Sequence, residues 1–155
     1  MNILELISVF FAATEGKFLI DILLATTFGY IIGAERESRG KDAGISTHIM
    51  VICGATLFTF MSSLVDPASK SRIAAQIVSG IGFLGAGLIL KEDGTKVRNL
   101  TTASSVWFAG AIGMALGFDY HFLGAIATVF AVFVPRIPKH NQIKKTVSSK
   151  IKIGR

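Results

Sequence analysis

The sequence has little charge and almost no cysteine. Charged residues make up 17% of its 155 residues, against about 25% in an average soluble domain. The single cysteine, Cys53, excludes an intramolecular disulfide and a zinc site built from several thiolates. Cys53 lies in an apolar run, where we expect it to serve as a small packing residue. The shortage of charge argues against a soluble enzyme, and the abundance of Phe, Ile, Leu and Val argues against disorder.

Hydrophobic residues dominate instead, at 51% of the chain with a mean hydropathy of +0.59. A membrane-spanning helix needs about 20 mostly apolar residues, with about 17 as the lower limit. Five stretches meet that limit: 18–34, 45–65, 73–90, 102–118 and 121–137. The sequence therefore predicts an all-α integral membrane protein with a five-helix transmembrane bundle over 18–137.

The first 17 residues form a separate segment. Residues 3–13 are apolar, but the run is short and contains Glu5. We expect a short interfacial helix within 1–17, lying on the membrane surface, with a sixth crossing as the alternative. No basic residue precedes Lys17, so we do not expect a cleaved signal peptide.

The positions of the basic residues predict an orientation. The net charge is +6, and 13 of the 16 Lys and Arg residues fall on one side of the five spans. The positive-inside rule then places the N-terminus outside and the C-terminus in the cytoplasm. Residues 138–155 become a basic cytoplasmic tail that attracts anionic lipid. Because no aromatic residues are interleaved with these charges, we do not expect nucleic-acid binding.

Small residues recur at four-residue spacing in three of the spans. Membrane helices associate where small residues let their backbones approach closely, so we expect helix packing and a homodimer through a glycine face, such as Gly82 or Gly113. In the third span, tight packing, an unwound ion or substrate site and a homodimer seam all remain open. The expected packing residues are Gly29, Gly33, Gly80, Gly82, Gly85, Gly87, Ala109 and Gly113.

Polar residues mark the two ends of the spans. On the outer side, Asp21 shares the face of the small residues, where it either reaches the surface, binds a cation or pairs with a base. Arg72 is the expected partner of Asp21, and Gln76 lies one turn further in. On the inner side, a polar cluster is expected whose oxygens would suit Mg²⁺, although no cofactor is predicted. Its candidate residues are Glu35, Arg36, Glu37, His48, Arg98, Thr101 and Thr102.

Four motifs in a fixed order resemble one family. They are G-A-E-R-E-S-R-G-K-D-A-G at 33–44, S-T-H at 46–48, R-I-A-A-Q-I-V-S-G-I-G-F-L-G-A-G-L-I at 72–89 and V-R-N-L-T-T-A-S-S-V-W at 97–107. Together they resemble the MgtC/SapB family of bacterial inner-membrane proteins. The sequence departs from the usual family pattern at Ser46, where Arg is common, and at Asn99, where Gly is common.

The resemblance implies a five-helix membrane domain and a role in magnesium homeostasis and in virulence-type adaptation. It also implies contact with other membrane proteins, such as the ATP synthase. The sequence shows no nucleophile and base at a recognisable spacing, so we do not expect an enzyme. Two functions remain: a membrane-embedded regulator that acts through protein contacts, and a transporter or channel component for Mg²⁺ or another cation.

Overall fold

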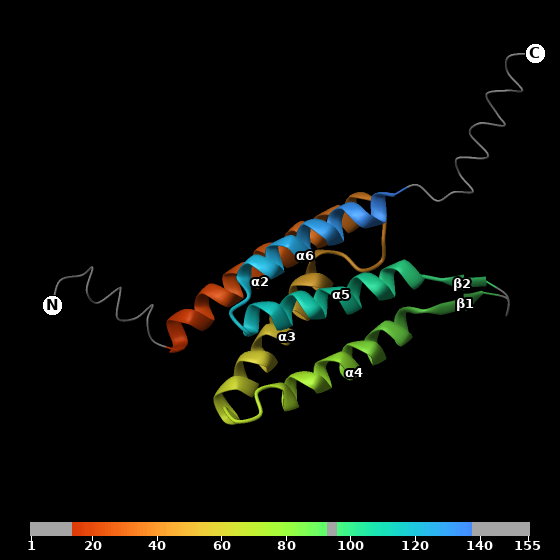
Figure 1. Ribbon diagram of the computed structural model, residues 1–155. Helices are drawn as coiled ribbons and strands as arrows, with labels where there is room; N and C mark the ends of the chain where they lie inside the picture. The colour runs from red at the N-terminus through yellow and green to blue at the C-terminus, as the bar shows by residue number, and fades with distance from the viewer. Residues whose placement is uncertain (1–13, 93–95, 138–155) are drawn as a thin grey trace, which may run out of the picture.

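The computed structural model describes residues 14–92 and 96–137, which form a bundle of five α-helices with one small hairpin (Figure 1). The helices are α2 (Thr14–Ser38), α3 (Ile45–Val65), α4 (Ser71–Leu88), α5 (Leu100–Gly117) and α6 (His121–Phe133). A 3₁₀ turn, η1 (Val134–Arg136), follows α6, and two strands, β1 (Leu90–Glu92) and β2 (Lys96–Arg98), join α4 to α5. Most of the expected interfacial segment and all of the basic tail lie outside the described residues.

Four of the helices, α2 to α5, are long and apolar enough to cross a membrane, and a shorter apolar helix covers His121–Arg136. Each coincides with one predicted span, and the ends differ. Helix α2 extends beyond its predicted span at both ends, and beside its last turn Glu35 and Arg39, four residues apart, form an ion pair. The last span stops being α-helical at Phe133, because Pro135 has no N–H to donate to the helix.

The connection between α4 and α5 contains part of an antiparallel hairpin, which pairs Leu90 with Arg98 and Glu92 with Lys96. Because the helices alternate in direction, this hairpin lies at the same end of the bundle as the α2–α3 connection and η1 (Figure 1). We call this the hairpin end. The turn end holds the start of α2, the α3–α4 loop and the α5–α6 turn.

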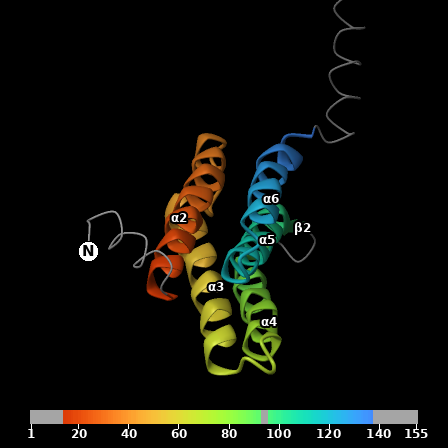
Figure 2. The same ribbon diagram turned by 60° about the vertical axis from the view of Figure 1, so that its left-hand side comes forward.

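Helix α3 is the centre of the bundle and packs most extensively against α2 and α5. Helix α6 lies against α5 and α2, while α4 packs mainly on α5 and α3. In Figure 2 the pair α2 and α3 lies to the left of α5 and α6. The main core is made of small and branched apolar residues, namely Ala25, Ile32, Ile52, Ala109, Ile112 and Leu116.

Glycines set the spacing of the central helices. A Cβ at Gly29 would lie 2.6 Å from the Cα of Ile49, and one at Gly33 would collide with the backbone of Ile45, so these glycines let α2 approach α3 closely. Gly113 in the same way lets α5 approach α3, because a Cβ at this position would collide with the carbonyl oxygen of Ile52. The expected homodimer seam at Gly113 is therefore wrong, because α3 of the same chain already covers it.

The glycines of α4 behave differently. A Cβ at Gly80, Gly82 or Gly87 would meet nothing within 4 Å, and one at Gly85 would be in ordinary contact, 3.7 Å from the carbonyl of Ala103. We expected tight packing within the chain at the four glycines of this helix. At three of them, no other described residue packs closely against the helix. Helix α4 remains an unbroken α-helix from Ser71 to Leu88, so the unwound site considered for it is also wrong.

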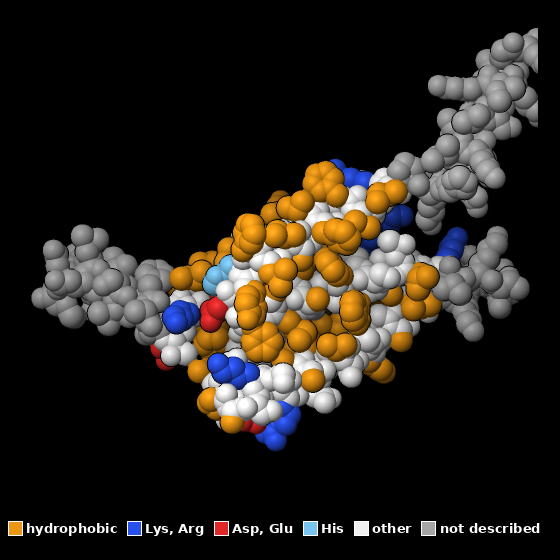
Figure 3. Space-filling view, in the orientation of Figure 1, with side chains coloured by type: hydrophobic (Ala, Val, Ile, Leu, Met, Phe, Trp, Pro, Cys, Tyr) orange, Lys and Arg blue, Asp and Glu red, His pale blue; other side chains and the backbone are white. Residues whose placement is uncertain are grey.

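An apolar groove of about 490 Å³ runs between α3 and α4. Met50, Gly54 and Phe58 line it from α3, and Gly80 and Leu84 from α4. Elsewhere the outer surface is also apolar: Figure 3 shows hydrophobic side chains across the middle of the visible face and charged side chains toward its edges. This distribution is the one expected of a bundle surrounded by lipid.

Candidate functional site

At the hairpin end, a buried arginine joins α2 to α5. Arg36 is only 1% exposed, and its Nη2 donates a hydrogen bond of 2.6 Å to Oγ1 of Thr102. The Nε of Arg36 is buried without a hydrogen-bond partner among the described residues. A buried guanidinium is costly unless it is paired, so this contact is a strong constraint on how α2 and α5 sit together.

His48 makes a parallel connection between α3 and α5. Its Nδ1 lies 2.9 Å from the carbonyl of Gly44, and its Nε2 lies 2.8 Å from Oγ of Ser105. Because a carbonyl can only accept, Nδ1 carries the proton in the neutral ring and Nε2 accepts from the Ser105 hydroxyl. Both ring nitrogens are thus occupied, as in a packed histidine rather than a metal ligand.

The two candidate carboxylates at this end, Glu35 and Glu37, also have basic or N–H partners. Oε1 of Glu35 lies 3.2 Å from both Arg39 and Arg136, and Oε1 of Glu37 accepts a 2.9 Å hydrogen bond from the backbone N–H of Ile45. The second oxygen of Glu35 is buried without a partner. These contacts fasten the end of α2 to the beginning of α3 and to η1.

Two further candidates from the sequence, Thr101 and Arg98, are exposed. Thr101 borders a pocket of about 310 Å³ between α5 and α6, and Arg98 lies at the end of β2. In the part of the chain that the structure describes, the hairpin end therefore does not gather its oxygens as an Mg²⁺ site would require. The carboxylates face arginines and a backbone N–H instead.

Asn99 explains one departure from the family pattern. Its φ of 61° places it in the left-handed region immediately before α5. Glycine adopts this conformation without strain, and Asn is among the few other residues that tolerate it. The backbone at this position can therefore keep the same conformation with either residue. Ser46, the other departure, is exposed on the first turn of α3.

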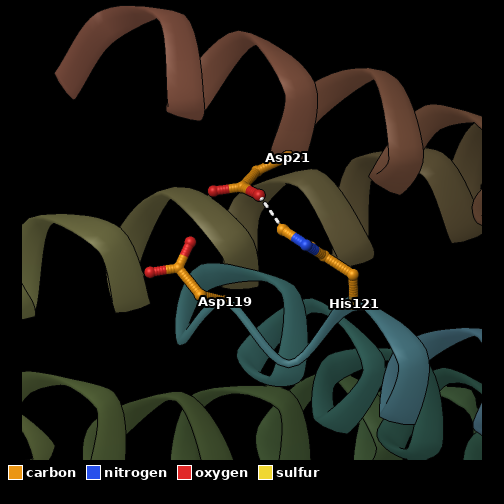
Figure 4. Close-up of side chains that lie close together, drawn as sticks. All are labelled: Asp21, Asp119 and His121. Carbon is orange, nitrogen blue, oxygen red and sulfur yellow. Dashed lines mark hydrogen bonds and ion pairs between the residues drawn. The ribbon is translucent and has the colours of Figure 1, made fainter. Parts of the chain in front are cut away.

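At the turn end, three potential metal ligands come together from two distant parts of the sequence. Asp21 of α2 is 1% exposed, and its Oδ1 lies 2.6 Å from Nε2 of His121, the first residue of α6 (Figure 4). Asp119, in the α5–α6 turn, completes the group, and one ligand atom from each residue lies within 4.8 Å of the others. Within residues 14–92 and 96–137, no other group of three His, Cys, Asp or Glu side chains lies close enough together to share a metal ion.

Asp119 and His121 were not among the residues selected from the sequence. The pairing expected between Asp21 and Arg72 is wrong: Arg72 lies 3.0 Å from Asp66, five residues before Ser71 begins α4, and its side chain is 72% exposed. Gln76 lines the groove between α3 and α4. The signal that could have found His121 is its position at the outer end of the fifth span, on the same side as Asp21.

Comparisons with known proteins agree with the resemblance that the four sequence motifs indicate. Residues 22–142 match the MgtC family. Protein MgtC of Salmonella typhimurium strain LT2 is 42% identical over 120 residues, which cover 77% of this chain and 51% of the relative. Protein MgtC of Brucella abortus strain 2308 is 48% identical over 124 residues, covering 79% of this chain and 48% of the relative. The chain thus spans about half the length of these curated relatives, and no solved structure matches it.

Proposed function

The chain belongs to the MgtC family, and from that premise we propose that it is a regulator embedded in the bacterial inner membrane. In this proposal it acts in magnesium homeostasis and virulence-type adaptation, the setting that resemblance to the family implies. It does so by binding other membrane proteins, among which the ATP synthase is a candidate, and by binding a second copy of itself. It is not an enzyme in this proposal.

The observation that carries the proposal is the exposed glycines of α4, of which Gly80 and Gly87 share the side that borders the groove to α3 and Gly82 lies roughly opposite. Gly80, Gly82 and Gly87 leave open space on this helix, although small residues in membrane helices are the usual means of close helix contact. In α2 and α5 the corresponding glycines are already used within the chain. An additional helix, from a partner or from a second copy, can approach α4 as closely as α3 approaches α5.

The proposed topology has five crossings, with α6 and η1 as the fifth. The N-terminus is outside and the C-terminus is cytoplasmic, because 13 of the 16 basic residues then lie inside. On this orientation the hairpin end faces the cytoplasm and the turn end faces outward. Arg36 and Arg136 then hold the cytoplasmic end of the bundle together through Thr102 and Glu35.

A cation transporter or channel component is the second candidate function, and Asp21 is the observation that favours it. A buried carboxylate in a membrane helix is costly and commonly marks an ion pathway. One oxygen of Asp21 has no hydrogen-bond partner. A flux assay separates the two functions. Purified full-length chain in proteoliposomes should move no more Mg²⁺ than protein-free vesicles if it is a regulator, whereas flux that is lost in Asp21→Asn would overturn the regulator proposal.

Cross-linking in cells tests the regulator directly. A photo-reactive residue at position 83 of α4 should capture a specific partner or a second copy, whereas the same residue at position 122 of α6 should not. The two sites are matched, since Phe83 and Phe122 are both 80% exposed. Equal capture from both sites, or capture from neither, would contradict a contact through α4.

A further inference from the structure

We infer that Asp21, Asp119 and His121 form a binding site for a divalent transition-metal ion of the zinc class. The site lies at the turn end and joins α2 to the α5–α6 turn. This inference goes beyond the proposed function and does not depend on it, since a bundle that transports nothing can still bind an ion.

The geometry requires little rearrangement. The three ligand atoms lie within 4.8 Å of one another, and ligands around a tetrahedral Zn²⁺ at about 2.0–2.2 Å from the metal lie roughly 3.3–3.6 Å apart. Asp119 supplies the freedom to close this gap, because it is exposed and lies in the turn between two helices. On binding, the proton on Nε2 of His121 is released, and the hydrogen bond to Asp21 is replaced by coordination.

An unpartnered atom points to a ligand independently of this spacing. Oδ2 of Asp21 is buried and has no hydrogen-bond partner, although Asp21 is only 1% exposed. In Figure 4 this second oxygen extends toward the side of the site where the Asp119 carboxylate lies. Buried polar atoms are almost always satisfied, and one that is not calls for an ion or a water. A metal ion between the two carboxylates would satisfy it.

The donor set determines the class of ion. One imidazole nitrogen and two carboxylate oxygens are the mixed ligands of zinc and neighbouring transition metals, whereas Mg²⁺ prefers oxygen alone and retains most of its water. Three protein ligands also leave a fourth position for water. The site therefore differs in chemistry from the Mg²⁺ cluster expected at the other end of the bundle.

The residues around the site determine how an ion reaches it and how tightly the ion binds. A pocket of about 380 Å³ adjoins it, lined by Asp119 and also by Lys17 and Lys70. This pocket gives an ion an entry from the turn end. The two lysines oppose the approach of a cation, so removing the charge of Lys17, one helical turn before Asp21, should tighten binding.

Zinc binding to the purified full-length chain in detergent tests the inference, with a fluorescent chelator as competitor. We expect one saturable Zn²⁺ site per chain that a hundredfold excess of Mg²⁺ does not displace. Asp119→Asn should weaken it at least about tenfold, because even outer partners of metal ligands are worth about 10–100-fold in affinity. Asparagine tolerates the left-handed backbone of this position, where φ is 64°, so the variant should keep the native helix content in circular dichroism.

Three comparison variants make the result decisive. Asp66→Asn, which removes a carboxylate elsewhere at the turn end, should bind Zn²⁺ as the wild type does, and Lys17→Gln should bind it more tightly. His121→Asn should lose binding as Asp119→Asn does, since its side chain is 41% exposed and its loss should not prevent folding. The inference is overturned if the wild type shows no saturable site, if Asp119→Asn binds equally well, or if a hundredfold excess of Mg²⁺ displaces the zinc.

Discussion

Replacing Gly113 by alanine should destabilise the bundle, whereas the same replacement at Gly82 should not. A Cβ at Gly113 would collide with the carbonyl oxygen of Ile52 and lie 2.7 Å from the Cβ of Ala55. Carbon atoms pack best at about 3.5–4.0 Å, so α3 and α5 would have to separate by about 1 Å. A Cβ at Gly82 would meet nothing within 4 Å.

The comparison isolates the cost of crowding. Both variants gain the same preference of alanine over glycine for helix, about 1 kcal/mol in water, so this term cancels between them. Forcing an extra carbon into a packed interior costs about 1–3 kcal/mol, and we expect the free energies of unfolding to differ by that amount. Titration with sodium dodecyl sulfate in detergent micelles, followed by circular dichroism, measures the difference.

The reasoning fails if the two variants unfold within about 0.5 kcal/mol of each other, the range of ordinary surface substitutions. A second readout separates folding from association. Gly82→Leu should reduce cross-linking between copies while leaving the monomer folded, because the added side chain projects from the outward face of α4. An oligomer unchanged by Gly82→Leu would contradict self-association through that helix.

Two further predictions concern the hairpin end and the orientation of the chain. Thr102→Val should destabilise the bundle by about 1.5–3 kcal/mol, the value of a hydrogen bond to a charged group. Thr101→Val, at an exposed neighbouring position, should leave the free energy of unfolding in detergent unchanged. Equal effects of the two substitutions would show that the contact between Thr102 and Arg36 is not stabilising. In a Cys53→Ala background, a membrane-impermeant maleimide added to intact spheroplasts should label Ser69→Cys but not Lys41→Cys, and the reverse pattern would invert the proposed topology.

The positions of the helices followed from the sequence because each depends on a continuous apolar run, which is a local property. The small residues of α2 and α5 could likewise be placed in helix contacts from their four-residue spacing, as Gly29 and Gly113 show. The glycines of α4 could not, since a row of small residues permits a close contact but does not identify the helix that makes it.

The polar contacts likewise include some that the sequence predicted and some that it did not. Glu35 and Arg39 form the ion pair that their spacing along one helix indicates. The partner of Asp21 lies 100 residues away at His121, and it depends on how α2 and α6 pack. Arg72 reached the nearer Asp66 because the α3–α4 loop brings that carboxylate beside it. Contacts that depend on packing between distant helices were therefore the part that the sequence could not determine.

The unequal lengths of α2 and α6 have a consequence for the lipid around them. With 25 residues, α2 is about 37 Å long, whereas the 16 residues from His121 to Arg136 reach only about 26 Å. The hydrocarbon layer of an average bilayer is about 30 Å thick. Because the two helices lie side by side (Figure 1), the charged ends of α2 emerge from the hydrocarbon layer while the bilayer thins beside α6, at a fraction of a kcal/mol per Å of mismatch. The molecule would then be most stable in thin membranes, and lipid thickness becomes a variable that any measurement of its association has to control.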